Sequence, residues 1–248
     1  MQKNKAALVL AAGKGKRMKS DLPKVLHQID GKSLIRRLME TLTGMDFDKI
    51  AVVVGHKGEM VIEELSDFNV EFVWQNRQLG TGHAVQMAES AFKDFSGTIM
   101  VTLGDAPFLT RKSIEKLFEV HLNNSAVATC LTAEVAKPKG YGRIVRKDGS
   151  DILLEIVEEK DASPKIQKIS EINSGTFCFN SRELFSILDK IQANNSQKEY
   201  YLTDTIKIFQ GMGKTCAVWR VPDSIEAEGI NDIDQLKKLE DEILKKKN

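Results

Sequence analysis

The chain has 248 residues, 42% of them hydrophobic, which is enough for one substantial core and predicts one main domain. Lys and Arg number 36 against 35 for Asp and Glu, so the sequence carries no overall charge that would attract nucleic acid or a membrane surface.

The cysteines and the apolar runs narrow the class further. Cys130, Cys178 and Cys216 are far apart and form no C-x-x-C pair, so a disulfide framework or a zinc site is disfavoured. Buried thiols in a reducing compartment are the simpler interpretation. No apolar run approaches the ~20 residues of a membrane span, and the polar start is not typical of a signal peptide. We therefore expect a soluble cytoplasmic protein.

The first informative stretch is an apolar run that ends in two glycines. Residues 6–12 read as a strand buried on both faces, and Gly13 and Gly15 follow at once. A glycine turn exposes backbone N–H groups, and Arg17 and Lys24 bring two cations to the same corner. Such groups suit a ligand with several phosphates. An ordinary strand-to-helix turn with solvated Lys and Arg is the alternative.

Two better-known phosphate loops do not match this stretch. A dinucleotide fingerprint needs Gly or Ala at its sixth position, where Met18 stands, and a P-loop needs Gly-Lys-Ser/Thr after four spacer residues. The loop therefore belongs to another class of phosphate site, if it is one.

The next elements alternate between helix and strand. Apolar residues at three-to-four spacing predict a helix after Gly31, and they are Leu34, Ile35, Leu38, Met39 and Leu42. Residues 50–54 and 70–74 read as strands, with a second helix near 60–65 between them. This alternation predicts a parallel α/β sheet whose ligands lie at the carboxyl ends of the strands, where the glycine loop also falls.

A polar segment with glycines follows the third strand. Gln75 and Gln78 supply amides that can read the edge of a base, and Gly80 would let that base lie against the backbone. A helix is expected from His83 onward, with His83 as a packing or capping residue. The alternative is a glycine helix N-terminus with surface glutamines.

The fourth strand, residues 98–103, ends at an aspartate. Asp105 lies just past a buried strand and near the phosphate loop, which suits a ligand of Mg²⁺. It could instead cap a helix that begins near Thr110.

The second half of the chain predicts a smaller lobe and more of the same sheet. Strands are expected at 126–133 and 215–221, helices at 182–191, from 199–204 onward and at 234–246, and a hairpin at 144–156 turned at Asp148-Gly149. Residues 134–180 resemble an inserted lobe. Glu158 and Asn173 could bond sugar hydroxyls there, although Glu158 alone reads as part of a solvated charged run.

These motifs together resemble sugar-1-phosphate nucleotidyltransferases, and most closely the N-terminal half of bacterial N-acetylglucosamine-1-phosphate uridyltransferases. The resemblance spans residues 8 to about 239 in seven ordered motifs: LAAGKGKRM, DLPKVLH, QLGTGHA, GDAP, GYGRI, VEEKDA and EINSG. Two positions depart from the family pattern, because Lys16 replaces Thr or Ser and Leu103 replaces Tyr, Ser or Cys.

The resemblance implies a Rossmann-like (GT-A type) fold: a mostly parallel sheet flanked by helices, with a smaller β-rich sugar-binding lobe. It implies a nucleotidyltransferase domain over 1–231, lobe elements at about 134–180, and a C-terminal helix over 232–248. The relatives continue into a left-handed β-helix of hexapeptide repeats that carries acetyltransferase activity. This sequence has none of these repeats, so we expect no acetyl transfer.

The site residues follow from the same resemblance. The catalytic residues implied are Arg17, Lys24 and Asp105. The nucleotide-binding residues implied are Leu10, Ala11, Ala12, Gly13, Gly15, Gln75, Gln78, Gly80 and Thr81. The sugar-binding residues implied are Leu103, Gly104, Gly142, Glu158, Asn173 and Thr203. Mg²⁺ is implied as the cofactor, held by Asp105 and Asn231, although Asn231 could also serve as a helix N-cap.

The reaction implied is transfer of UMP from UTP to N-acetylglucosamine-1-phosphate by a monomer or small homo-oligomer. Two alternatives stay open: a transferase for another hexose-1-phosphate that uses UTP or TTP, and a silent nucleotide-sugar-binding domain. The sugar phosphate is already anionic, so such catalysis would need positioning and charge neutralisation more than a general base.

Overall fold

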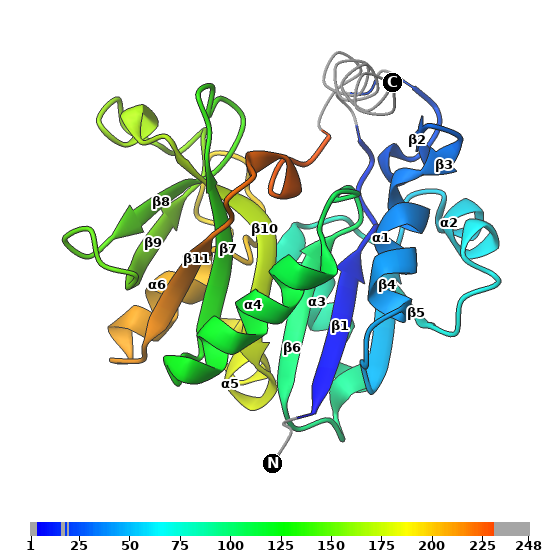
Figure 1. Cartoon of the computed structure of the whole chain (residues 1–248), viewed down its shortest axis with the longest axis horizontal. Helices are drawn as coiled ribbons and strands as arrows, with labels where there is room; N and C mark the ends of the chain where they lie inside the picture. Colours follow the sequence, from blue (N-terminus) through cyan, green and yellow to red (C-terminus); the bar gives the residue numbers. More distant parts are fainter. Residues whose placement is uncertain (1–3, 16–17, 19, 231–248) are drawn as a thin grey trace.

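The computed structural model describes residues 4–15, 18 and 20–230. Seven strands form the continuous path of the main sheet in the spatial order β11-β7-β10-β6-β1-β4-β5 (Figure 1). In chain order they are β1 (Lys5–Leu10), β4 (Lys49–Val54), β5 (Glu71–Trp74), β6 (Thr98–Leu103), β7 (Ala128–Glu134), β10 (Glu171–Asn180) and β11 (Cys216–Arg220). All neighbours on this path pair in parallel except β10, which is antiparallel to β6 and β7. The predicted mostly parallel α/β sheet is confirmed.

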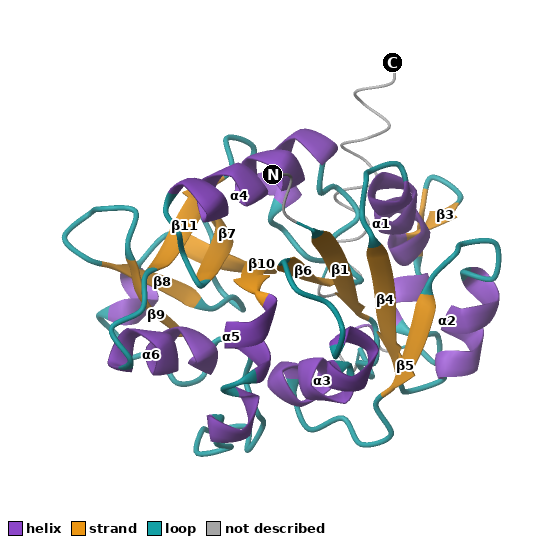
Figure 2. Ribbon diagram, turned by 90° about the horizontal axis from the view of Figure 1, so that it is seen from below, coloured by secondary structure: helices purple, strands orange, loops and turns teal. Residues whose placement is uncertain are grey.

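Helices cover both faces of the sheet (Figure 2). The helices are α1 (Leu34–Thr43), α2 (Gly58–Glu64), α3 (Thr81–Met87), α4 (Arg111–Asn123), α5 (Ser181–Phe185) and α6 (Asp204–Gly211). Alternate residues of β1 explain the two layers, because Leu8 packs in the core with α3, α5 and α6, and Val9 in the core with α1, α2 and α4. Burial on both faces accounts for the continuous apolar run in the sequence.

A smaller hairpin extends the sheet on the β10 side. Strands β8 (Arg143–Arg146) and β9 (Leu153–Val157) pair antiparallel, and β8 joins β10 at Arg143 and Ile172. Positive φ angles at Asp148 (46°) and Gly149 (72°) form the predicted turn. The hairpin leads into the main sheet through β10, so this lobe and the parallel sheet share a strand.

Helix positions agree with the sequence in most places and differ in one. The predicted helix over 182–191 is wrong: α5 ends at Phe185, and a separate 3-10 turn covers Leu188–Lys190. The apolar positions of this stretch are buried in both pieces, so their pattern did not reveal the break. The short strands β2 (Gln28–Ile29) and β3 (Lys32–Ser33) form a separate antiparallel pair.

Further predictions concern the cysteines and membrane spans. All three cysteines are free and buried, as predicted. Burial raises the pKa of the Cys216 thiol to about 12, so this thiol is un-ionised at neutral pH. Within the described ranges, none of the helices has the length and apolar character needed to cross a membrane.

Candidate active site

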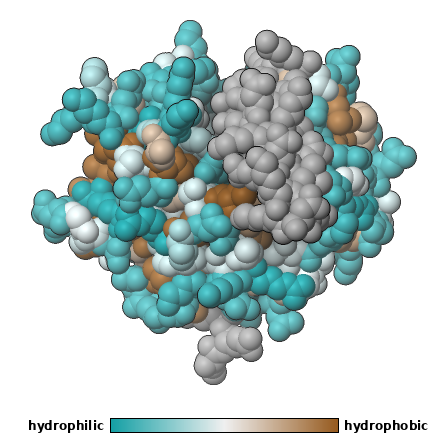
Figure 3. All heavy atoms as spheres, turned by 45° about the horizontal axis from the view of Figure 1, so that its top comes forward, coloured by the Kyte–Doolittle hydropathy of each residue, from teal (hydrophilic) through white to brown (hydrophobic). Residues whose placement is uncertain are grey.

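The loop after β1 lies at the carboxyl ends of three parallel strands. Ala11 N donates to Val53 O at 2.8 Å, and Gly104 N donates to Leu10 O at 2.9 Å, so backbone bonds connect this loop to β4 and β6. His56 N also donates to Ala12 O at 3.2 Å. The part of this side of the molecule that Figure 3 leaves uncovered is mainly hydrophilic, with apolar side chains in separate patches. The predicted phosphate loop therefore lies where an α/β sheet binds ligands.

The two glycines of this loop have different surroundings. A Cβ on Gly13 would meet no atom of the described residues within 4 Å, which leaves its backbone open to a ligand on that side. A Cβ on Gly15 would lie 2.7 Å from the Lys24 Cβ, and Gly15 has a φ of 58°. Gly13 thus fits the predicted role of close approach to phosphate, whereas Gly15 is needed to pack Lys24 against the loop.

Lys24 and Asp105 form an ion pair at the centre of this region. Lys24 begins the 3-10 turn Lys24–Leu26, and its Nζ contacts Asp105 Oδ2. Asp105 is only 3% exposed and follows Gly104, which packs tightly against Val25, Ala11 and Ile35. The helix α4 is capped by Thr110, whose Oγ1 accepts from Ser113 N at 3.2 Å, so Asp105 is not the cap of that helix.

The carboxylate of Asp105 suits a divalent cation. The Lys24 ammonium already pairs with it, so this position favours positive charge. Within the described ranges, no three His, Cys, Asp or Glu side chains converge to hold a metal ion. Mg²⁺ commonly binds one or two carboxylates plus substrate phosphates and water, so this donor set fits it better than zinc.

The second predicted binding segment is the loop from Gln75 to Thr81. Gln75 is 3% exposed, and its Nε2 donates to Gly80 O at 3.1 Å and lies 2.8 Å from His83 Nδ1. Gln78 Nε2 donates to Gln75 O at 2.9 Å. Burial lowers the pKa of His83, which keeps its ring neutral as a partner for this amide. His83 therefore holds Gln75 in place, a role that its position in the sequence did not reveal.

Gly80 packs closely against another backbone segment. A Cβ there would lie 2.5 Å from Tyr200 O and 2.8 Å from Tyr200 N, so the missing side chain makes room for that segment. Gly82 N donates to Tyr200 O at 2.8 Å, and Leu202 N donates to Thr81 Oγ1 at 2.9 Å. The loop around Gly80 is thus tied to the segment that contains Thr203.

Three segments of the smaller lobe and the segment before α6 bring several of the predicted sugar residues together. Thr203 Oγ1 donates to Glu158 Oε1 at 3.1 Å, and a Cβ on Gly142 would lie 3.4 Å from either Glu158 oxygen. Asn173 N donates to Gly142 O at 2.9 Å. Burial raises the pKa of the Glu158 carboxyl, with the Thr203 hydroxyl acting in the opposite direction. A desolvated carboxylate with few partners is typical of a polar recognition site.

Leu103 lies beside this lobe as an apolar side chain. It packs against Gly175, where a Cβ would lie 2.5 Å from a Leu103 methyl carbon and where φ is 79°. Asn173 Oδ1 accepts from Gly175 N at 2.9 Å, which holds the turn around it. The departure from the family residue at position 103 is thus accommodated by a glycine on the facing strand.

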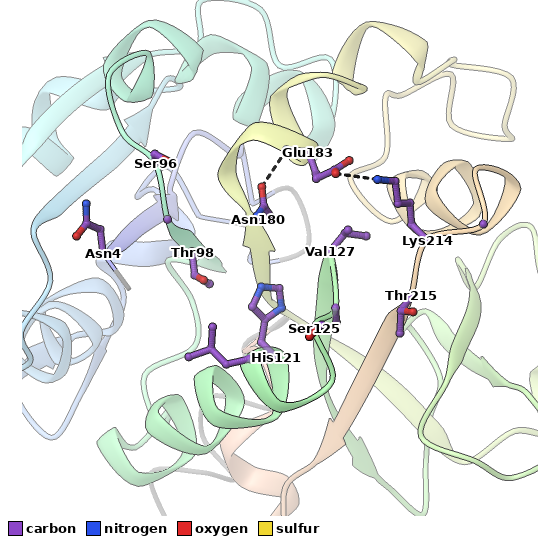
Figure 4. A pocket seen from close by; sticks show the side chains of 14 residues that line it. Asn4, Ser96, Thr98, His121, Ser125, Val127, Asn180, Glu183, Lys214 and Thr215 are labelled. Atoms are coloured by element: carbon purple, nitrogen blue, oxygen red, sulfur yellow. Dashed lines mark hydrogen bonds and ion pairs between the residues drawn. The ribbon is translucent and has the colours of Figure 1, made fainter. Parts of the chain in front are cut away.

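A cavity lies elsewhere, at the amino ends of the parallel strands. It has a volume of about 720 Å³, and its wall includes Thr98, Thr215 and the buried His121 (Figure 4). Glu183 and Lys214 form an ion pair across part of it, 2.9 Å apart. This cavity is at the opposite edge of the sheet from the glycine loop, and none of the predicted site residues lines it.

The structure brings most of the predicted residues into three groups: the glycine loop with Lys24 and Asp105, the loop from Gln75 to Thr81, and the segments around Glu158, Asn173 and Thr203. Sequence reasoning missed that residues 200–202, a strap between the last two groups, bond to the loop around Gly80, because bonds through backbone N–H and C=O leave no side-chain pattern. Arg17, Lys16 and Asn231 lie outside the described residues, as does the predicted helix 234–246.

Fold and site together define an α/β protein with a phosphate-type glycine loop beside a buried carboxylate. The chain belongs to the MobA-like NTP transferase domain family, whose profile matches residues 7–199.

Curated relatives agree with this placement. The chain is 47% identical over 226 residues to the Bifunctional protein GlmU of Streptococcus sanguinis (strain SK36), which covers 91% of this chain and 49% of that protein. It is 46% identical over 234 residues to the protein of the same name from Streptococcus mutans serotype c (strain ATCC 700610 / UA159), covering 94% and 50%. The chain thus spans about half the length of the curated relatives it matches.

Solved structures share the fold at lower identity. A UDP-glucose pyrophosphorylase complexed with UDP-glucose superposes with a TM-score of 0.77 at 18% identity, covering 98% of this chain and 99% of that one. HddC from Yersinia pseudotuberculosis complexed with GMP-PN gives a TM-score of 0.71 at 20% identity, covering 96% and 99%. These neighbours establish the Rossmann-like nucleotidyltransferase fold.

Proposed function

We propose that the chain transfers UMP from UTP to N-acetylglucosamine-1-phosphate and releases pyrophosphate. One observation carries this proposal: the strap 200–202 bonds to the loop that contains Gly80 and Thr81, and the next residue, Thr203, bonds to Glu158. Such a layout gives one place for a nucleoside triphosphate and another for a sugar phosphate. The identity to GlmU proteins favours UTP and the N-acetylglucosamine ester as the pair.

The reaction is an in-line displacement at the α-phosphorus of UTP. A phosphate oxygen of the sugar ester attacks, and pyrophosphate leaves on the opposite side. The nucleophile is anionic before it reacts, so proton removal is not required and positioning with charge neutralisation carries the rate.

Each half of the site has a task in this scheme. The backbone at Gly13 would bind the triphosphate, Lys24 would place its ammonium on phosphate oxygens, and Gln75 would bind the uracil. Glu158, Asn173 and the Gly142 backbone would bind the hydroxyl and N-acetyl groups of the sugar. Asp105 and Asn231 would hold Mg²⁺, which neutralises the phosphate oxygens when it is bound.

A second candidate keeps the reaction and changes the sugar. Leu103, packed on Gly175, stands where the family pattern has Tyr, Ser or Cys, so the contact to the sugar at this point differs and the acceptor could be another hexose-1-phosphate. A silent nucleotide-sugar-binding domain is disfavoured because Arg17, Lys24, Asp105 and Asn231 are all present in the sequence.

Pyrophosphate release tests the proposal directly. The purified chain is assayed with UTP, Mg²⁺ and each of several sugar-1-phosphates, and N-acetylglucosamine-1-phosphate is expected to give the highest kcat/KM. A higher value with another hexose phosphate favours the second candidate. Binding of UTP without release in any mixture would overturn the transferase proposal.

A further inference from the structure

Tyr141 makes a hydrogen bond that spans two parts of the molecule. It stands in the loop before β8, is partly buried, and packs against the core that includes α1 and α4. Its hydroxyl donates to Gly229 O at 3.2 Å, across 88 positions of the sequence. The partner segment follows β11 and the 3-10 turn Ser224–Glu226, and it crosses the top of the sheet in Figure 1.

The partner segment lies directly on Asp105. Ile230 N approaches Asp105 O at 3.4 Å, and a Cβ on Gly229 would lie 3.5 Å from Asp105 Oδ2. The Gly229 backbone is therefore in van der Waals range of the carboxylate that pairs with Lys24. Whatever fixes this backbone also fixes one wall of the carboxylate's surroundings.

The other side of Tyr141 is anchored in the lobe. Arg143 is 2% exposed, and its guanidinium donates to Tyr141 O and pairs with Glu159, with 2.7 Å between Nη2 and Oε2. The residue between Tyr141 and Arg143 is Gly142, whose backbone oxygen accepts from Asn173 N at 2.9 Å. The tyrosine is thus held by the strands that carry the proposed sugar-binding residues, while its hydroxyl bonds to the Gly229 backbone beside Asp105.

We propose that Tyr141 is a positioning residue that connects the sugar-binding lobe to the cation-binding carboxylate through Gly229. This inference rests on the proposed function and goes beyond it, because Tyr141 would act through the Gly229 backbone, which lies beside Asp105. The bond holds the wall beside Asp105 in place, so the affinity for a divalent cation depends on it.

Calorimetric titration of UTP with and without Mg²⁺ tests this without any turnover. The measured quantity is the factor by which Mg²⁺ tightens UTP binding. In Tyr141→Phe this factor should fall about three- to tenfold, the range for one lost hydrogen bond. UTP binding without Mg²⁺ and the Tm should stay near the values of the unmodified chain. An unchanged factor, or equal weakening with and without Mg²⁺, overturns the proposal.

Two further variants sharpen the experiment. Ser224→Ala removes a hydroxyl bond within the same segment, to Glu228 Oε1 at 2.9 Å, and should leave the Mg²⁺ factor unchanged. In an Asp105→Asn background, Tyr141→Phe should cause no further fall, since both act on the same cation. A full additional fall there would place the tyrosine's effect elsewhere and overturn the proposal.

The result separates this inference from the proposed function. A lowered Mg²⁺ factor in a chain that releases no pyrophosphate with any sugar phosphate supports the positioning role and removes the transferase. Normal pyrophosphate release by the unmodified chain, with an unchanged Mg²⁺ factor in Tyr141→Phe, leaves the transferase and removes the positioning role.

Discussion

The nucleotide half and the sugar half of the candidate site are built in different ways. The nucleotide half uses short loops at the ends of parallel strands, held by backbone bonds such as Ala11 N to Val53 O. The sugar half uses side chains from three distant segments, represented by Glu158, Asn173 and Thr203. The first depends on backbone shape and glycine, and the second on long-range packing. Substitutions should therefore affect the two halves differently.

The largest effect is expected at the carboxylate between the halves. Asp105→Asn removes one negative charge beside Lys24 and from the proposed cation site. Turnover should fall at least ~100-fold, because charge neutralisation at the phosphates is the main catalytic term. Pyrophosphate release at saturating Mg²⁺ measures it.

A matched control separates chemistry from folding. Glu119→Gln removes a charge from an exposed ion pair with Lys116 and should leave turnover unchanged. Full activity of Asp105→Asn at saturating Mg²⁺ would show that this carboxylate is not at the reaction centre.

Alanine substitutions of two glycines in the nucleotide half should have different effects, one on the Tm and the other on turnover. Gly80→Ala places a Cβ against the Tyr200 backbone at a φ of 116°, and such strain costs about 1–3 kcal/mol before the clash is counted. Its Tm should fall clearly. Gly13→Ala meets no atom within 4 Å, so its Tm should hold while turnover falls about tenfold, because the methyl group keeps phosphate from the backbone.

Thermal unfolding gives the Tm of both variants, and initial rates give their turnover. Equal losses of Tm in the two variants would contradict the packing difference. A Gly13→Ala chain with full turnover would mean that phosphate does not approach this backbone.

Most of the nucleotide half could be predicted from the sequence because its signals are local. The apolar run before Gly13 and the strand before Asp105 both specify strands that end at the same edge of the sheet. The sugar half could be assigned only through family resemblance, since Glu158 alone reads as a surface charge. No local pattern predicts that Thr203 bonds to it. The packing at Gly80 could not be predicted either, because the Tyr200 backbone that lies against it is 120 residues away in the sequence.

The sugar half should show a trade-off between stability and function at Glu158. Burial raises the pKa of the Glu158 carboxyl in the folded chain. At a pH between the ordinary and the raised pKa, the folded chain therefore keeps a proton that the unfolded chain has lost. Stability therefore falls as pH rises through that window. Glu158→Gln removes this penalty and should raise the Tm at neutral pH, with a gain that shrinks as pH falls toward the ordinary glutamate pKa.

Glu158→Gln should also bind the sugar phosphate less tightly. KM for the sugar phosphate should rise about tenfold, the cost of a lost charged hydrogen bond, while UTP binding stays constant. Glu155→Gln is the control, because Glu155 on β9 forms an exposed ion pair with Lys207 on α6. It should change neither KM for the sugar phosphate nor UTP binding. A rise in Tm without a change in KM would remove Glu158 from the sugar site.

The smallest effect concerns the choice of base. The structure indicates which hydrogen bonds the Gln75 amide can make to a base. The Gln75 amide nitrogen is bonded to Gly80 O and lies at His83 Nδ1, which turns its carbonyl oxygen toward other donors. That oxygen can accept from the N3–H of uracil or thymine, whereas cytosine has an unprotonated N3 that would leave a buried group unpaired.

An unpaired buried group costs roughly 1–3 kcal/mol, which corresponds to at least about a fivefold preference. We therefore expect the order UTP, then TTP, then CTP, with ATP and GTP nearly inactive because purines are larger. Gln75→Ala should narrow the ratio of kcat/KM for UTP to that for CTP more than it lowers the rate with saturating UTP. Gln192→Ala, at an exposed position, should leave the ratio as it is. Initial rates with each nucleotide give the ratio directly, and a Gln75→Ala chain that keeps the full preference would move base recognition away from this loop.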